Sequence, residues 1–322
     1  MTDLLSPVKN SIEKLDLVLR TNHSVPEIPD LLNRTVLVGG KRLRPALCFL
    51  MGQALGVPQE RMIPFARAAE FTHSASLAHD DVVDNASTRR NLRTINAESS
   101  NKRAVLAGDL LLARVMVELS ESGDLDIIHD LALVIEDLVN GEWLQIDIRG
   151  NINTTLNELI EVSKRKTASL MSWCCLVAAR VSEHNNSDLR QLASEFGENL
   201  GIAFQMIDDV IDFTESGEKD FAKDLKEGIV NYVVSDLLKR KPELKPETEK
   251  LLGQKEIGEL PWSSEALEES LQNIRNLSQA YLQRAEEKLV EIKKMVPAQT
   301  QIAKESYASL ENLLQFLSIR GH

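Results

Sequence analysis

Apolar residues recur at helical spacing along nearly the whole chain, and this pattern restricts the fold more than any other feature. Repeats every three to four residues predict long amphipathic helices, over residues 62–84, 101–120, 125–148, 155–182, 187–213, 264–293 and 300–319. No period-two run that would predict a strand appears in the sequence. We therefore predict an all-α fold, and a chain of 322 residues can fill a single helical domain over residues 1–322.

Shorter elements are expected between these helices. Val8, Ile12, Leu15 and Leu19 share one face of a predicted N-terminal helix. A short helix over residues 31–38 should end at Gly39-Gly40, and Pro45 suits the first turn of the next helix. Residues 214–228 and 241–260 predict a loop and an irregular connection.

The charge of the chain restricts its partners. A formal net charge of −12 argues against binding nucleic acid, whose phosphates need a positive face. No apolar run is long enough to span a bilayer, and the first residues lack a secretory signal. The three cysteines show neither disulfide nor zinc spacing. We expect a cytoplasmic protein with no stable membrane insertion.

One acidic motif occurs twice, as HDDVVD at residues 79–84 and as IDDVID at residues 207–212. Both copies contain D-D-x-x-D inside an apolar helical stretch, which places the outer carboxylates on one helix face. The candidate metal ligands are Asp80, Asp81, Asp84, Asp208, Asp209 and Asp212.

Crowded carboxylates near an apolar core need a compensating cation. Mg²⁺ suits them, because it takes oxygen ligands, keeps some waters and is often completed by substrate phosphates. Two such motifs on facing helices would hold a metal cluster that a diphosphate could bridge. A solvated acidic face explains one copy equally well, but two copies in apolar segments make that explanation weak.

Basic and polar residues that could bind a diphosphate group lie near the two aspartate motifs or upstream of them in the sequence. GGKRLRP at residues 39–45 lies at a helix start, where anions are favoured. Arg89 and Arg90 follow the first aspartate motif, and Gln205 shares a helix face with Asp208. Taken singly, each of these features has a simpler explanation. GGKRLRP could be an ordinary basic loop, Lys166 a surface lysine and His73 a buried core histidine.

Together these motifs resemble the trans-polyprenyl diphosphate synthase family along nearly the whole chain. The resemblance is carried by GGKRLRP, HSASLAHDDVVDNASTRR, NKRAVLAGDLLLAR, GEWLQ, KRKTASL and GIAFQMIDDVID. It implies a helical bundle of the isoprenoid synthase type with a deep central active-site cavity, usually in a homodimer. The implied substrates are isopentenyl diphosphate and an allylic diphosphate, with Mg²⁺ as cofactor.

The resemblance also implies a role for each matching residue. The two aspartate motifs would bind Mg²⁺. The pocket for isopentenyl diphosphate would comprise Lys41, Arg44, His73 and Arg90. Lys166, Thr167 and Gln205 would act in the catalytic step by holding the allylic diphosphate, together with Arg89. Departure of that diphosphate would leave an allylic cation, which the double bond of isopentenyl diphosphate attacks.

One position departs from the family pattern. A lysine and a threonine usually follow D-L-x-E-G, but here DLKEG is followed by Ile229, Val230 and Asn231. Lys219 and Lys223, upstream, are the candidate replacements for the missing diphosphate-binding lysine.

In the family that the chain resembles, the residues just before the first motif form the floor of the product cavity, so small residues there imply a long product. Thr72, Ala75 and Ser76 leave no aromatic side chain to block a product tunnel. We therefore predict head-to-tail condensation to a long-chain polyprenyl diphosphate, such as a precursor of quinone side chains. The alternatives are a shorter farnesyl or geranylgeranyl product and a non-catalytic subunit of a heteromeric synthase. A terpene cyclase is disfavoured, because it has no isopentenyl diphosphate for GGKRLRP to bind.

Overall fold

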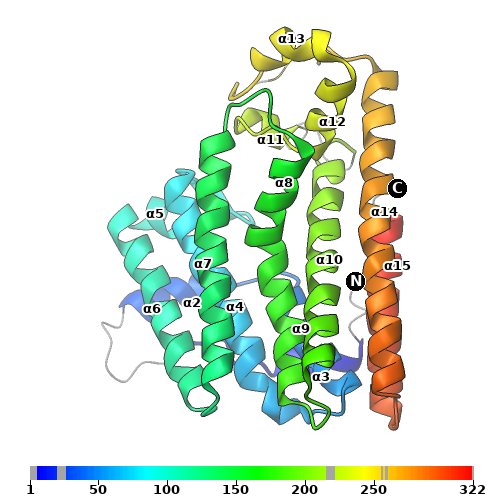
Figure 1. The fold of residues 1–322 in the computed structure, drawn as a ribbon. Coiled ribbons are helices and arrows are strands. Elements are labelled where there is room, and N and C mark those ends of the chain that lie inside the picture. Colours follow the sequence, from blue (N-terminus) through cyan, green and yellow to red (C-terminus); the bar gives the residue numbers. More distant parts are fainter. Residues whose placement is uncertain (1–5, 20–26, 215–221, 255–256, 258–259, 321–322) are drawn as a thin grey trace. The chain divides into compact units, whose positions relative to one another are not determined.

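The computed structural model describes residues 6–19, 27–214, 222–254, 257 and 260–320, and these residues are almost wholly helical (Figure 1). The all-α prediction is confirmed. The chain divides into two compact units: unit 1 comprises residues 1–135, 173–190 and 296–310, and unit 2 comprises residues 136–172, 191–295 and 311–322. All the unit boundaries except the one after Met295 fall within helices, and the single domain over residues 1–322 stays a prediction.

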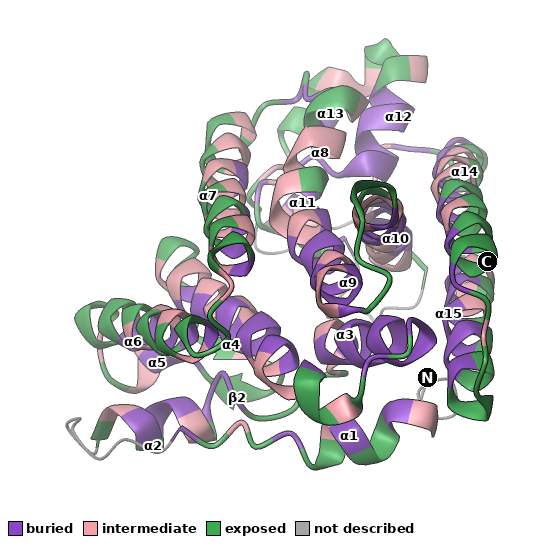
Figure 2. Cartoon of the chain, turned by 60° about the horizontal axis from the view of Figure 1, so that its bottom comes forward, coloured by how far each residue is buried: buried purple, intermediate pink, exposed green. Residues whose placement is uncertain are grey.

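Unit 1 contains the first half of the chain's elements. They are α1 (Lys9–Glu13), α2 (Glu27–Arg34), α3 (Leu43–Ala54), α4 (Gln59–Val83), β1 (Thr88–Arg89), β2 (Leu92–Arg93), α5 (Ile95–Glu98), α6 (Asn101–Ser120) and the first part of α7 (Leu125–Ile148). Every residue of α3 except Arg44 is buried, as Figure 2 shows in purple. A helix that is apolar all round belongs in a core.

Helices α4 and α6 pack along each other within unit 1. Gly108 makes one close approach possible, because a Cβ atom there would lie 2.3 Å from Nε2 of His79. The same His79 nitrogen lies 3.1 Å from the Val105 carbonyl oxygen and 3.4 Å from Oδ1 of Asp109. The motifs around residues 79 and 108 therefore serve helix packing as well as chemistry.

Unit 2 contains most of the remaining helices. They are α8 (Leu156–Ser163), a π-helical turn over Lys164–Ala168, α9 (Ser169–Val181), α10 (Ser187–Ile211), α11 (Lys223–Lys226), α12 (Tyr232–Arg240), α13 (Lys245–Glu249) and α14 (Ser264–Met295). α15 (Gln301–Arg320) contributes its last part. Most of α9, from residue 173 on, belongs to unit 1, as do residues 187–190 at the start of α10.

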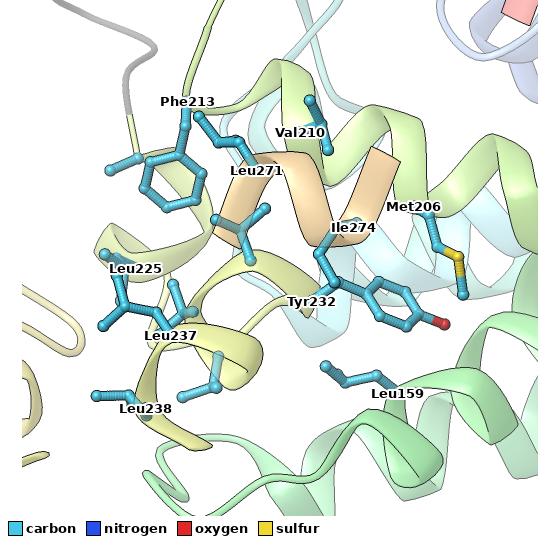
Figure 3. Packing of buried hydrophobic residues seen from close by; sticks show 14 of the residues in the cluster. Leu159, Met206, Val210, Phe213, Leu225, Tyr232, Leu237, Leu238, Leu271 and Ile274 are labelled. Carbon is cyan, nitrogen blue, oxygen red and sulfur yellow. The ribbon is translucent and has the colours of Figure 1, made fainter. Parts of the chain in front are cut away.

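A hydrophobic cluster fixes α10, α11, α12 and α14 against one another in unit 2 (Figure 3). Met206 and Val210 come from α10, Leu225 from α11, and Ile274 from α14. Tyr232 at the start of α12 is 1% exposed, and its hydroxyl donates to Oγ of Ser163 at 2.9 Å. This packing positions the second aspartate motif, which ends α10.

Polar residues start the helices where sequence rules expect them. Thr94 and Ser100 accept from backbone N–H groups at the starts of α5 and α6. Thr155 and Glu158 form a capping box on α8. The Asn231 side chain accepts from the Val234 N–H at the start of α12. These contacts satisfy donors that a helix start leaves unpaired.

The N-terminal helix predictions are wrong in their extents. Helix α1 ends at Glu13, since Oδ1 of Asp16 accepts from the Val18 N–H at 3.1 Å and Oδ1 of Asn33 accepts from the Leu19 N–H at 2.9 Å. These side chains compete with helical hydrogen bonds for the same backbone. The short helix predicted at 31–38 lies at Glu27–Arg34 instead.

Three local features escaped the sequence analysis. The segment expected as one helix over 155–182 contains the π-helical turn at Lys164–Ala168. A two-stranded hairpin forms at residues 88–93, where Arg90 and Asn91 both have positive φ, as in a type I′ turn. Helix α12, whose residues from Tyr232 to Leu238 are all buried, was not predicted either.

Gly201 is expected to be essential to the packing of α10 against the π-helical turn. A Cβ atom at this position would lie 2.5 Å from Cα of Ala168, which is backbone and cannot rotate away. Gly201→Ala should therefore lower the free energy of unfolding by about 1–3 kcal/mol, the usual cost of overpacking. Urea unfolding measures the change, and Gln191→Ala on the exposed side of α10 is the control. Equal stability of the two variants would contradict this account.

Candidate active site

The first aspartate motif lies in the last turn of α4, in unit 1. The helix ends in a Schellman motif: the Ala86 N–H donates to the Asp81 carbonyl at 3.0 Å and the Asn85 N–H to the Val82 carbonyl at 3.3 Å. Asn85 supplies the positive φ of 52° that this ending requires. The chain therefore reverses directly after Asp84 and leads into the hairpin that carries Arg89.

Asp81 is the buried member of this motif, with 1% of its surface exposed. Its Oδ1 accepts from Nε of Arg89 at 2.8 Å, while its Oδ2 is buried without a hydrogen-bond partner among the described residues. Burial raises the pKa of the Asp81 carboxyl, and the Arg89 guanidinium offsets only part of that rise. A bound cation would satisfy the remaining oxygen. Asp80 is half-buried and Asp84 is exposed.

The β1–β2 hairpin places the two arginines that follow the motif. The Asn96 side-chain amide holds the hairpin to α4 by donating to the carbonyls of Asp81 and Ala86, each at 3.0 Å. Arg89 faces Asp81. Arg90, at the turn, lies against Gly40, where a Cβ atom would come within 2.7 Å of its Nη1. The glycine therefore lets the guanidinium approach the 39–42 loop.

That loop has an unusual backbone, since Gly39, Gly40 and Arg42 all have positive φ. Arg42 is held there by an ion pair with Glu70 and by a hydrogen bond to the Leu37 carbonyl. Both side chains of the pair are largely buried, at 14% and 4% exposed. Sequence reasoning missed this pair, because an isolated Glu70 on α4 carries no motif.

His73 lies among the arginines of unit 1. Burial lowers the pKa of its imidazole well below the ordinary value of 6.5, and the charges of Arg44, Arg90, Arg89 and Arg42 lower it further. The histidine is therefore neutral near pH 7. Arg44 is half-buried in the first turn of α3, and Lys41 is exposed in the loop before it. Unit 1 thus brings the predicted residues Arg44, His73, Arg89 and Arg90 into one cationic group.

The second aspartate motif ends α10 in unit 2, and backbone N–H groups hold two of its carboxylates. Oδ2 of Asp209 accepts from the Tyr232 N–H at 3.0 Å, and its Oδ1 accepts from the Gln205 side chain at 3.0 Å. Asp212 accepts from the N–H groups of Lys223 and Asp224 at 3.0 and 3.4 Å. The half-buried Asp208 lies 3.8 Å from Nη1 of Arg320.

A pocket of about 730 Å³, open to solvent, lies beside Asp209 within unit 2. Four of the predicted residues line it: Lys166, Thr167, Gln205 and Asp209. Oγ1 of Thr167 donates to Oε1 of Gln205 at 3.1 Å, which continues the hydrogen-bond chain to Asp209. Thr167, Gln205 and Asp209 are therefore joined directly to one another.

Lys166 and Thr167 lie on the π-helical turn, a distortion often found at functional sites. Nζ of Lys166 pairs with Glu142 and donates to Oε1 of Gln145 at 2.8 Å. Gly141 allows this contact, because a Cβ atom there would lie 2.7 Å from Cγ of Lys166. The GEWLQ segment thus fixes the lysine, a role that the motif alone did not reveal.

Carboxylates crowd this side of the pocket. Asp224 also lines the pocket, and Nδ2 of Asn231 donates to its Oδ2 at 2.9 Å. Burial raises the pKa of Asp209 well above its ordinary value, with Asp224 adding repulsion. The same two causes raise the pKa of Asp212 to about 7. Asp224 begins the DLKEG segment, which indicated the missing lysine but no role for the aspartate itself.

The donor set suits Mg²⁺, which prefers oxygen ligands. Within the described residues, no three His, Cys, Asp or Glu side chains converge closely enough to hold a metal ion by themselves. Mg²⁺ sites commonly use one or two carboxylates and fill the rest with waters and substrate phosphates. The unsatisfied Oδ2 of Asp81 and the raised pKa of Asp209 fit such partial sites.

The position of the missing lysine lies at the pocket itself. Ile229 lines the pocket with Val230, Asn231 and Tyr232. Lys223 does not line it; its side chain is 62% exposed and its Nζ lies 3.6 Å from Glu227. The replacement role expected of Lys223 therefore finds no support, and Lys219 lies outside the described residues.

The sequence of the chain matches that of a known protein family. The family model described as Polyprenyl synthetase matches residues 25–268, about three quarters of the chain. The chain belongs to the polyprenyl synthetase family. The resemblance found in the sequence motifs is thereby confirmed.

Two curated relatives and one solved structure illustrate the similarity of this polyprenyl synthetase. A decaprenyl-diphosphate synthase of Dictyostelium discoideum is 36% identical over 261 residues, or 79% of this chain and 56% of that protein. A mitochondrial solanesyl-diphosphate synthase of Oryza sativa is 36% identical over 225 residues, or 64% of this chain and 52% of that protein. The chain thus spans about half the length of these curated relatives.

The solved structure supports the fold of the polyprenyl synthetase. A polyprenyl synthase from Caulobacter crescentus, complexed with calcium and isoprenyl diphosphate, superposes with a TM-score of 0.83 at 24% identity. The superposition covers 99% of this chain and 97% of that one. The isoprenoid synthase fold is therefore confirmed. In the part of the chain that the structure describes, no helix is both long and apolar enough to cross a membrane.

His73 is expected to make the stability of this polyprenyl synthetase depend on pH. The folded imidazole stays neutral, because burial and the nearby arginines lower its pKa below 6.5, whereas the unfolded chain takes up a proton there. The unfolded state therefore binds more protons below about pH 6.5, and the free energy of unfolding falls as the pH drops from 7 towards 5. His73→Gln should show a shallower fall in urea unfolding across this range. Equal slopes for the two proteins would contradict the assignment.

Proposed function

We propose that this polyprenyl synthetase condenses isopentenyl diphosphate head-to-tail with an allylic diphosphate and releases a long-chain trans-polyprenyl diphosphate. The observation that carries the proposal is the unit 2 pocket, where Lys166, Thr167, Gln205 and Asp209 line one cavity and form a continuous chain from Thr167 to Asp209. The names of the two curated relatives, decaprenyl- and solanesyl-diphosphate synthase, support a long product.

Unit 1 is proposed to bind isopentenyl diphosphate. Lys41, Arg44, His73 and Arg90 would hold its diphosphate group. The exposed Lys41 and the guanidinium group of Arg90 beside Gly40 can meet an anion from solvent. Neutral His73 can serve as a hydrogen-bond partner without adding charge.

Unit 2 is proposed to bind the allylic diphosphate with Lys166, Thr167 and Gln205. Nε of Arg89 donates to Asp81 in unit 1, and a role for Arg89 in holding the allylic diphosphate stays a prediction from the family resemblance. The pocket walls formed by Ile148, Leu159, Val162 and Val230 are apolar. Apolar walls reduce the number of water molecules beside an allylic cation, which water would otherwise quench.

The two aspartate motifs are proposed to bind Mg²⁺: Asp80, Asp81 and Asp84 in unit 1, and Asp208, Asp209 and Asp212 in unit 2. Bound Mg²⁺ would supply positive charge that stabilises the departing diphosphate. Support comes from the buried, unsatisfied oxygen of Asp81 and from the carboxylates crowded around Asp209, whose repulsion a cation relieves.

We also propose that the protein forms a homodimer through α6. Leu106, Ala113 and Val117 lie exposed along this helix at spacings of seven and four residues, and Figure 2 shows the exposed residues of α6 in green. Leu106 is 57% exposed and Val117 is 52% exposed, which is unusual for apolar residues at heptad-like spacing.

The cytoplasmic location stays a prediction.

Turnover by the purified protein tests the proposed reaction. With farnesyl diphosphate, isopentenyl diphosphate and Mg²⁺, we expect polyprenyl products by mass spectrometry, and chelation with EDTA should abolish them. Asp209→Asn and Lys166→Ala should each lower kcat by about 10²–10³, the usual loss when one charge-stabilising group is removed. Arg284→Ala, an exposed change on α14, is the control.

Two outcomes of this assay would overturn the proposal. Turnover only after addition of a second protein would make the chain a non-catalytic subunit. Cyclic hydrocarbon from the allylic substrate alone would make it a terpene cyclase.

Residues before the first motif are expected to limit product length. Ala75 is fully buried on α4, and Ser76, next to it, is half-buried. A phenylalanine here should occupy space needed by a growing chain, so Ala75→Phe should shorten the product. Ser76→Phe is the second variant, since its position tolerates added volume better. If both variants fold and mass spectrometry shows unchanged product length, these residues do not limit the product.

A further inference from the structure

We propose that Arg149 is a second cation of the unit 2 pocket and binds the diphosphate group of the allylic substrate. This inference rests on the proposed function and names a residue that the sequence motifs did not select. Arg149 directly follows α7 and lines the same pocket as Lys166, Gln205 and Asp209.

The position of Arg149 is fixed on two sides. Its Nε donates to the Glu227 carbonyl at 3.0 Å, and the N–H of the next residue, Gly150, donates to the Gly228 carbonyl at 2.9 Å. These contacts hold the guanidinium beside the segment that leads to Ile229, which also lines the pocket.

The charges of the pocket call for such a residue. Asp209 and Asp224 bring two carboxylates to its wall, while Arg149 and Lys166 are the Arg and Lys side chains among the described residues that line it. Lys166 is already paired with Glu142. Arg149 adds a second positively charged side chain to this wall, where the diphosphate group can contact it.

The chemistry of arginine suits the task. The guanidinium carries five N–H donors in a planar fork that matches phosphate oxygens, and it keeps its charge at any working pH. Arg149 is exposed, so an anion can approach its guanidinium from solvent.

Binding of farnesyl diphosphate, measured calorimetrically with Mg²⁺ and without isopentenyl diphosphate, tests the proposal. Arg149→Ala and Arg149→Gln should each raise the Kd, and the KM for farnesyl diphosphate, about tenfold, as expected for loss of a charge-assisted hydrogen bond. Arg149→Lys keeps the charge and should stay within about threefold of wild type. The KM for isopentenyl diphosphate should be unchanged. Arg284→Ala is the matched arginine control on α14.

A rescue variant separates binding from a structural role. Ile229→Lys places a new cation on the same pocket wall, so it should recover part of the affinity lost in Arg149→Ala. If Arg149 only secures the chain at Glu227, its variants should lower the melting temperature, raise the KM for both substrates, and gain nothing from Ile229→Lys. That result would overturn the inference.

Failure of the inference can be told from failure of the proposed function. Wild-type turnover, with weaker binding in Lys166→Ala but unchanged binding in Arg149→Ala, would reject Arg149 and leave the function in place. A wild-type protein that neither binds farnesyl diphosphate nor turns it over would reject both.

Discussion

Carboxylates built into apolar helices are the constraint around which this protein is arranged. A buried anion is costly unless donors or cations surround it. Asp81 has one oxygen on Arg89, and Asp209 has both oxygens on N–H donors. Much of the local structure exists to supply these partners: the β1–β2 hairpin brings Arg89 to Asp81, and the start of α12 brings the Tyr232 amide to Asp209.

Glycines and a helix distortion give the binding side chains their positions. Gly141 and Gly201 let α7 and α10 approach the π-helical turn closely, so that Lys166 reaches Glu142 and Thr167 reaches Gln205. In unit 1, the absence of a side chain at Gly40 likewise lets the guanidinium group of Arg90 lie close to the backbone. These glycines are therefore as important to the site as the charged side chains that pack against them.

The sequence predicted most of the long helices and the residues of the unit 2 pocket, because both depend on local pattern. α6 and α7 begin and end where their apolar period does, at Asn101–Ser120 and Leu125–Ile148. The predictions failed where distant contacts decide. α12 is nine residues long, too short for a helical period to stand out in the sequence. The Arg42–Glu70 pair, and the position of Asp224 and Arg149 at the pocket, become visible only once the chain has folded, since each depends on a partner far away in sequence or on a shared cavity.

The hydrogen bond from the Tyr232 N–H to Asp209 has one more consequence. The carboxylate both lines the pocket and accepts from the first amide of α12, so any charge that binds it must redistribute electron density at that amide. The amide is buried, and exchange with solvent will not obscure it. Its proton chemical shift in an NMR spectrum is therefore a built-in reporter of occupancy, able to register ligand at Asp209 whether or not catalysis follows.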